Sequence, residues 1–174
     1  MTDTAKRQSL FRECKTVAEN SLYTAQAHFV MAGQASWRTR LFLLFPAVVA
    51  AVSGILTSVG LPGWIGAFAS AAGLVIAVAT FLGADRMEIS HKTAGNLFTC
   101  LRHEARLLHE TFHLDLTDEQ LLVEVRRLSD RYNSLVQTTE VTDNKAYEEA
   151  RKRVKSGTFN LDFRRNETAR QNDR

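Results

Sequence analysis

The 44 residues from position 41 to position 84 include no Asp, Glu, Lys, Arg or His. An α-helix needs about 20 apolar residues to cross the hydrocarbon core of a bilayer, so this run is long enough for two spans. The sequence Gly60-Leu61-Pro62-Gly63 interrupts the run near its middle, where Pro and Gly favour a turn. We therefore predict a transmembrane hairpin with spans at 41–59 and 64–83. The alternative is a buried hairpin in a soluble protein, but the rest of a 174-residue chain is too short to cover so much apolar surface.

The charges on either side of the hairpin predict its orientation. Arg38 and Arg40 precede the first span, Arg86 and Lys92 follow the second, and the turn carries no charge. Loops rich in Lys and Arg stay on the cytoplasmic side of a membrane, so we expect both termini in the cytoplasm. The first forty residues are polar and amphipathic and contain no signal-peptide core.

Outside the hairpin, the apolar positions recur every three or four residues, which is typical of amphipathic helices. Residues 1–40 form one such region and residues 85–157 another, and residues 158–174 form a polar tail. Thr117 and Gln120 have the spacing of a capping box before a helix whose apolar seam continues to Leu135. No segment alternates like a strand. The predicted fold class is all-α: a two-span hairpin with long cytoplasmic helices that form a bundle.

Small residues are frequent in both predicted spans. Small side chains spaced four apart let membrane helices approach closely, and a hairpin can satisfy only one side of each span. We therefore predict a homo-oligomer that assembles in the membrane. Ser53 and Thr57 could add a mild polar stripe, or their hydroxyls could bond to carbonyls of their own helix. The candidate packing or pore residues are Ser53, Gly54, Thr57, Gly66, Ser70, Gly73 and Ala77.

The overall charge is a weak guide to partners. The net charge of +3 is too small and too dispersed to indicate direct binding of nucleic acid. Arg102, Arg106, Arg126 and Arg127 form a basic group that could contact a phosphorylated ligand or a partner, although such residues more often form a solvated helix face. The two cysteines, Cys14 and Cys100, are too few for a disulfide framework and are typical of a reducing compartment.

One motif suggests metal chemistry. His109-Glu110-Thr111-Phe112-His113 matches H-E-x-x-H, in which two histidines one helical turn apart bind zinc and the Glu activates water. Zinc proteases also need a third ligand and a sheet edge that holds the substrate, and the sequence offers neither at a recognisable spacing. We interpret these histidines as polar residues near a helix end. A membrane-tethered metal enzyme is the weakest alternative.

No other catalytic pattern is present. Phosphate-binding glycine loops and nucleophile motifs are absent, so we predict no enzymatic activity, no catalytic residue, no metal and no cofactor.

The layout resembles the SLATT domains, two-span effectors found beside nucleotide-synthesising and nucleotide-sensing partners in bacterial conflict systems. The resemblance covers roughly residues 10–135. It rests on the helix "ENSLYTAQAHFVMAGQASWRTR" with Tyr23 and His28, the turn "GLPGW", and the helix "DRMEISHKTAGNLFTCLRHEARLL" with His91 and Ala94. It implies a pore-forming or membrane-disrupting effector of antiviral defence in the bacterial inner membrane, controlled by a nucleotide-synthesising or nucleotide-sensing partner. The resemblance assigns no functional residue.

Together these features predict an oligomeric membrane effector that contacts lipid and acts as a regulated pore or membrane disruptor. The alternative is a membrane-anchored helical scaffold that recruits a cytoplasmic partner.

Overall fold

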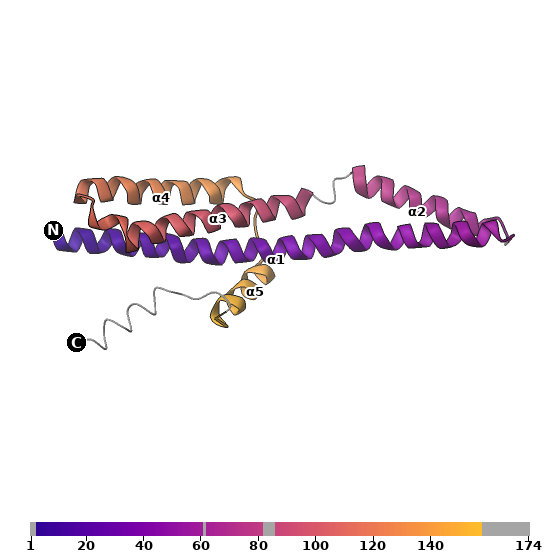
Figure 1. Cartoon of the computed structure of the whole chain (residues 1–174), viewed down its shortest axis with the longest axis horizontal. Coiled ribbons are helices and arrows are strands. Elements are labelled where there is room, and N and C mark those ends of the chain that lie inside the picture. Colours follow the sequence, from indigo (N-terminus) through magenta and orange to yellow (C-terminus); the bar gives the residue numbers. More distant parts are fainter. Residues whose placement is uncertain (1–2, 61, 82–85, 158–174) are drawn as a thin grey trace. The chain divides into compact units, whose positions relative to one another are not determined.

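The computed structural model describes residues 3–60, 62–81 and 86–157, and every regular element within these ranges is helical. The all-α prediction is therefore confirmed. The helices are α1 (Asp3–Ser58), α2 (Trp64–Phe81), α3 (Arg86–Glu110), the short 3₁₀ helix η1 (Phe112–Leu114), α4 (Asp118–Thr138) and α5 (Asn144–Lys155) (Figure 1). The predicted polar tail at 158–174 and the end of the predicted second span at 82–84 lie outside the described residues.

The chain divides into two compact units. Unit 1 comprises Met1–Met31 and His91–Arg174, and unit 2 comprises Ala32–Ser90. Helix α1 contributes its first half to unit 1 and its second half to unit 2. The backbone is helical through residue 41, where we predicted the first span to begin, and through Pro46.

Unit 1 is a bundle in which the first half of α1 packs against α3 and α4 (Figure 1). Residues three or four apart on each helix face a common core, as expected for amphipathic helices. The buried core residues are Leu10, Cys14, Val17 and Ala18 of α1, Leu101, Ala105 and Leu108 of α3, and Leu121, Val125 and Leu128 of α4. The shorter α5 buries one stripe of small apolar residues, Ala146, Ala150 and Val154.

Local sequence signals define the ends of α4 and α5. Thr117 Oγ1 accepts the backbone N–H of Gln120 at 3.3 Å, and Gln120 Oε1 accepts that of Thr117 at 3.0 Å, which confirms the predicted capping box. The side chain of Asp143 caps α5 by accepting the N–H of Ala146. After α5, Gly157 has a φ of +80°, a left-handed conformation that glycine adopts without steric cost.

Unit 2 is a hairpin of the second half of α1 and α2. Gly60 has a φ of +90° and its N–H donates to the carbonyl of Thr57 at 3.1 Å, which closes the end of α1. Across the turn, the N–H of Ile65 donates to the carbonyl of Pro62 at 3.0 Å and opens α2. Pro62 lies two residues before α2, in the turn, where its fixed φ and missing N–H disturb no helical hydrogen bond.

A close contact between α1 and α3 in unit 1 requires glycine. A Cβ atom at Gly95 would lie 2.7–3.0 Å from three ring atoms of Phe29. Side chains larger than hydrogen at this position must therefore push the Phe29 ring away.

The Gly95→Ala substitution should lower the free energy of unfolding of unit 1 by about 1–2 kcal/mol, because overpacking costs about 1–3 kcal/mol and exceeds the gain in helix propensity of about 0.5–1 kcal/mol. Chemical unfolding of the full chain in detergent would measure this change. Gly33→Ala is the matched control, since a Cβ at Gly33 meets nothing within 4 Å and should be neutral or stabilising. Adding Phe29→Leu should restore part of the loss, and a Gly95→Ala variant as stable as the parent would contradict the packing argument.

Candidate functional site: the apolar hairpin

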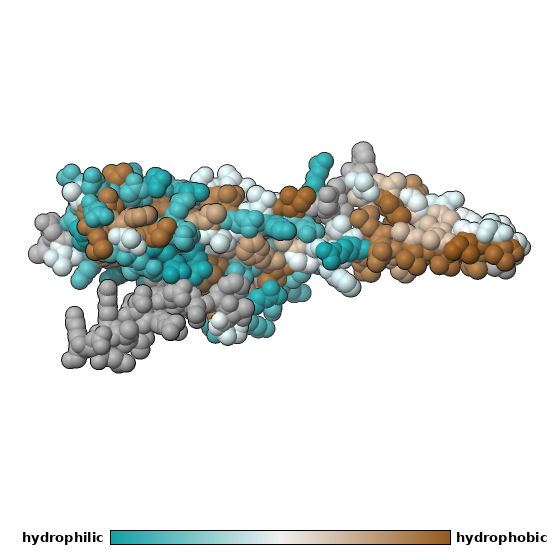
Figure 2. Space-filling model, viewed as in Figure 1, coloured by the Kyte–Doolittle hydropathy of each residue, from teal (hydrophilic) through white to brown (hydrophobic). Residues whose placement is uncertain are grey.

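The hairpin of unit 2 exposes most of its apolar side chains. Figure 2 shows hydrophobic residues over this unit, whereas the surface of unit 1 mixes hydrophobic and hydrophilic residues. The exposed large apolar residues of α1 here are Leu41, Phe42, Leu44, Phe45, Val48, Val52, Ile55 and Leu56, and those of α2 are Trp64, Phe68, Leu74, Val75 and Val78. A soluble protein would bury such residues, because each exposed one forgoes roughly 1.5–3 kcal/mol of transfer free energy.

Length and composition distinguish the two helices. Among the described residues, α1 is the helix long and apolar enough to cross a membrane, and only 11% of its most apolar 18-residue window is buried. A core helix of a soluble protein would be mostly buried instead. The apolar segment of α2, Trp64–Thr80, is shorter than the 18 residues that define a candidate membrane span. The 18 residues of α2 extend about 27 Å at 1.5 Å per residue, close to the ~30 Å of a hydrocarbon core.

The small residues predicted to pack in the membrane have two different environments. Gly66 faces the other helix of the hairpin, since a Cβ there would lie 3.7 Å from Oγ1 of Thr57. A Cβ atom at Gly54 or Gly73 would have no neighbour within 4 Å among the described residues. At these two positions, therefore, no other described part of the same chain packs closely against the glycine.

Hydroxyl groups of the hairpin helices donate to carbonyls of their own helices. Thr57 Oγ1 donates to the carbonyl of Ser53 at 2.8 Å, and Ser70 Oγ donates to that of Gly66 at 3.4 Å. Ser53 is buried, whereas Ser70 and Ala77 are exposed. Of the two alternatives for Ser53 and Thr57, the geometry favours a back-bonded Thr57 over a stripe of free hydroxyls.

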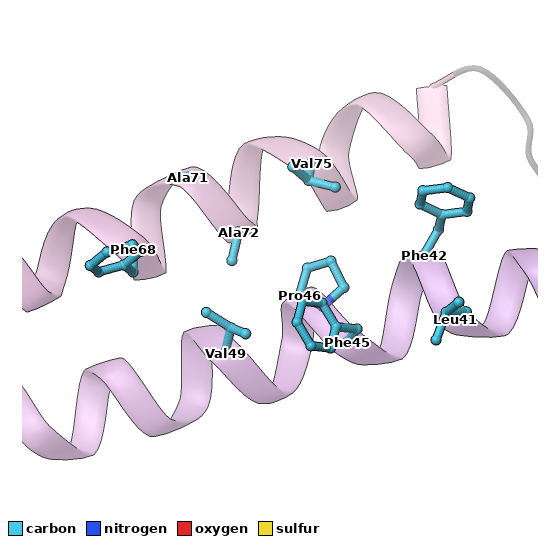
Figure 3. A pocket seen from close by; sticks show the side chains of 9 residues that line it. All are labelled: Leu41, Phe42, Phe45, Pro46, Val49, Phe68, Ala71, Ala72 and Val75. Atoms are coloured by element: carbon cyan, nitrogen blue, oxygen red, sulfur yellow. The ribbon is translucent and has the colours of Figure 1, made fainter.

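An open apolar groove of about 590 Å³ runs between α1 and α2. Figure 3 shows Phe42 and Pro46 of α1 and Ala72 of α2 pointing toward the opposite helix. The groove residues are Leu41, Phe42, Phe45, Pro46, Val49, Phe68, Ala71, Ala72 and Val75, none of which is polar. Nothing in this lining can orient a polar substrate, so the groove suits hydrocarbon.

The predicted arginine group is partly neutralised. Arg106 pairs with Glu110 of its own helix at 3.3 Å, and Arg127 pairs with Glu124 of its own helix at 2.8 Å. Arg102 lies on α3 and Arg126 on the exposed face of α4. Local carboxylates thus reduce the positive field that a phosphorylated ligand would need.

The H-E-x-x-H motif is not on one helix. Helix α3 ends at Glu110, and His113 lies in η1. Both imidazoles instead meet the ring of Phe11 edge-on, with centroid distances of 5.6 Å for His109 and 4.8 Å for His113. The described residues contain no group of three or more His, Cys, Asp or Glu side chains that could hold a metal ion. These contacts fit a structural role for the two histidines.

Unit 1 contains a polar contact that the spacing of residues does not reveal. Nδ1 of His28 on α1 lies 3.0 Å from Nδ1 of His91 on α3, and both side chains are 1% exposed. Nε2 of His91 lies 3.3 Å from Oε2 of Glu140, in the segment between α4 and α5. The two atoms lie within ion-pair distance, although the buried Nε2 makes no hydrogen bond in the described part of the chain.

The surroundings of the histidine pair are aromatic. Phe98 stacks on His28 with a centroid distance of 5.7 Å, and Tyr132 of α4 meets Phe98 edge-on at 6.0 Å. Burial, and then the neighbouring His91, lower the pKa of His28 to about 4, while Glu140 partly opposes them. Tyr23, His28 and His91 stand in the segments that carry the SLATT resemblance, but the sequence alone assigned them no role.

No known protein family, no curated protein and no solved structure matches this chain.

Proposed function

We propose that this protein is an oligomeric membrane effector whose hairpin inserts into a lipid bilayer and acts as a regulated pore or membrane disruptor. The observation that carries this proposal is the exposed apolar surface of unit 2, on a segment without ionisable side chains. Lipid provides the apolar environment that this surface lacks in water. The basic residues Arg38, Arg40 and Arg86, all exposed, support an orientation with both termini in the cytoplasm.

Assembly is supported by the two open glycines. No described residue of the same chain lies within 4 Å of the place of a Cβ at Gly54 or Gly73, which leaves an uncovered patch at each glycine. In lipid, where apolar burial drives little association, close backbone approach at such patches is a main source of helix packing. A second copy of the chain offers the complementary patch, so a closed ring of hairpins is the favoured assembly.

The resemblance to SLATT domains supplies the biological context of the proposal. It supports action in the inner membrane of a bacterium during antiviral defence, triggered by a nucleotide-synthesising or nucleotide-sensing partner.

Ion flux from liposomes tests the proposed activity. The purified full chain, reconstituted at increasing protein-to-lipid ratios, should release a trapped dye or ion with a steep dependence on ratio, because several copies must meet. A chain that reconstitutes and assembles but releases nothing, even with its signalling partner active, would favour the scaffold instead.

The orientation is tested by thiol labelling in intact cells. In a Cys100→Ser background, single cysteines at Ser9 and Ser156 should resist an impermeant thiol reagent, and one at Gly63 should react. Cys14 is a suitable silent residue, since it is fully buried and burial raises the pKa of its thiol to about 11. Labelling of Ser9→Cys together with protection of Gly63→Cys would reverse the proposed topology.

One observation favours the scaffold as the second candidate. Leu114, Leu122 and Val123 are exposed apolar residues in and around η1 and α4 of unit 1, and a small groove beside them includes Leu116 and Glu119. Such a patch fits a protein partner better than lipid, because it alternates with charged side chains.

A further inference from the structure

We infer that His28, His91 and Glu140 form a proton-operated switch that joins α1 and α3 locally, at His28 and His91 of unit 1, and that this contact opens when both imidazoles are charged. The inference concerns unit 1 alone, and it does not depend on whether the hairpin conducts ions. The contact joins residues 63 positions apart in the sequence, and both rings are fully enclosed.

The short Nδ1–Nδ1 distance restricts which ring nitrogens carry a proton while the contact is closed. Two nitrogens 3.0 Å apart need one N–H between them, so one ring donates and the other accepts. Nε2 of His91 faces the carboxylate of Glu140, which favours a proton on that nitrogen. In the neutral state Nδ1 of His91 is then the acceptor and Nδ1 of His28 the donor.

The closed contact can accept one added proton but not two. With a single added proton, the positive charge is shared over a hydrogen-bonded pair of rings and balanced by Glu140. With a second proton, both Nδ1 atoms carry hydrogens that point at each other, and two positive charges face one carboxylate. The rings must then separate, because both are buried and their repulsion is screened less than it would be in solvent.

The groups around the pair leave Glu140 as the main balancing charge. The charges that act on His28 come from His91 and Glu140. Helix α5 contributes Tyr147, which meets Tyr23 of α1 with a centroid distance of 6.4 Å, and α4 contributes Tyr132 through Phe98. Lys92, next to His91 on α3, is exposed to solvent.

His28 and His91 lie where the chain passes between unit 1 and the hairpin, so opening their contact affects both connecting segments. His28 lies three residues before the end of the first segment of unit 1, and His91 is the first residue of the second segment. Opening this contact therefore frees α1 and α3 at the points where the chain leaves unit 1 for the hairpin and returns from it. Protonation would thus act on the two segments that connect unit 1 to the hairpin along the chain.

The test uses the full chain in lipid nanodiscs. Nitrogen-15 spectra of labelled histidine report the tautomer and charge of each imidazole, and the five histidines of the chain can be assigned by single substitutions. Spin labels on native Cys100, which is exposed on α3, and on Asn20→Cys, exposed on α1, report the separation of the two helices. At pH 7.5 we expect complementary neutral tautomers for His28 and His91 and one narrow distance. Between pH 6.5 and 4 we expect a second, longer distance to appear as the pH approaches the pKa of His28, which is about 4.

Two variants separate the switch from general acid unfolding. In His28→Asn, the amide can donate to or accept from Nδ1 of His91 but does not titrate, so the long-distance population at pH 4.5 should fall at least fivefold. His103→Asn removes an exposed imidazole from α3 and should behave like the parent. An unchanged distance in the parent at pH 4.5, or equal opening in His28→Asn and the parent, would overturn the inference. So would a zinc-dependent shift of both Nδ1 resonances, which would make the pair a metal site.

Discussion

Replacing Gly73 with Leu is expected to abolish membrane depolarisation by the overexpressed protein while leaving its insertion intact. In a single chain, a Cβ at position 73 meets nothing within 4 Å, so the larger side chain has space in the monomer. Leu also favours insertion into lipid, so no hydrophobicity is lost. The substitution therefore acts on contacts between copies of the chain.

The expected size of this effect depends on how many subunits carry the substitution, because each one adds its own overpacking cost. Overpacking costs roughly 1–3 kcal/mol per site, and each 1.4 kcal/mol is a factor of about ten in an equilibrium constant. In a symmetric oligomer every subunit bears the same cost. Assembly should thus fall by more than tenfold at equal expression, and depolarisation should fall with it.

Crosslinking and a potential-sensitive dye, applied to the same cells, would measure assembly and depolarisation together. Ala67→Leu is the matched control, since it adds similar bulk at an exposed position of α2 about a third of a turn away from Gly73. A Gly73→Leu variant that depolarises as well as the parent would show that this face of α2 is not the assembly contact. Loss of activity in both variants would point instead to a general effect of bulk on the hairpin.

The second large effect concerns pH. The free energy of unfolding should decrease by on the order of 3 kcal/mol as the pH falls from about 6.5 to about 4, because the pKa of His28 is about 4 in the folded chain and 6.5 as a free side chain. Between pH 6.5 and pH 4, His28 is mostly protonated in the unfolded chain and mostly neutral in the folded chain. Stability is thus fully present above pH 6.5 and is lost as the pH falls toward 4.

Chemical unfolding in detergent at a series of pH values would give this profile. His28→Asn keeps a hydrogen-bonding group beside His91 but removes the titration, so its profile should be flatter by most of that amount. His103→Asn, on the exposed face of α3, should retain the slope of the parent. A parent profile that is flat between pH 6.5 and 4 would contradict the burial-driven pKa of His28.

The two effects address different units. The Gly73 experiment depends on contacts between hairpins, whereas the pH experiment depends on one contact inside the bundle of unit 1. If the result of one experiment contradicts its prediction, the prediction tested by the other experiment is unaffected. If both succeed, a lipid-facing assembly surface and a proton-sensitive contact exist in the same chain, joined by the continuous helix α1.

Local chemistry made much of the fold predictable from the sequence. The uncharged run at 41–84 predicts apolar helices because transfer of side chains out of water depends on composition and hardly on context. The capping box was predictable because Thr117 and Gln120 lie three residues apart, and the seam of Leu121, Val125 and Leu128 was predictable because its spacing follows the helical period. Gly60, with its left-handed backbone, marks the turn for the same reason.

Other features depend on contacts between distant segments, and only the tertiary structure decided them. The spacing of residues did not by itself establish that α1 continues as one helix from Asp3 through Pro46 to Ser58, or that α3 ends between the two histidines of H-E-x-x-H, at Glu110. The Gly95–Phe29 contact and the His28–His91 pair join residues more than sixty positions apart. Periodicity identifies which side of a helix is buried, but the register between two packed helices is set by how all their side chains fit together. The sequence therefore determined which segments are apolar and where helices begin, and the packing of unit 1 determined which polar groups meet in its interior.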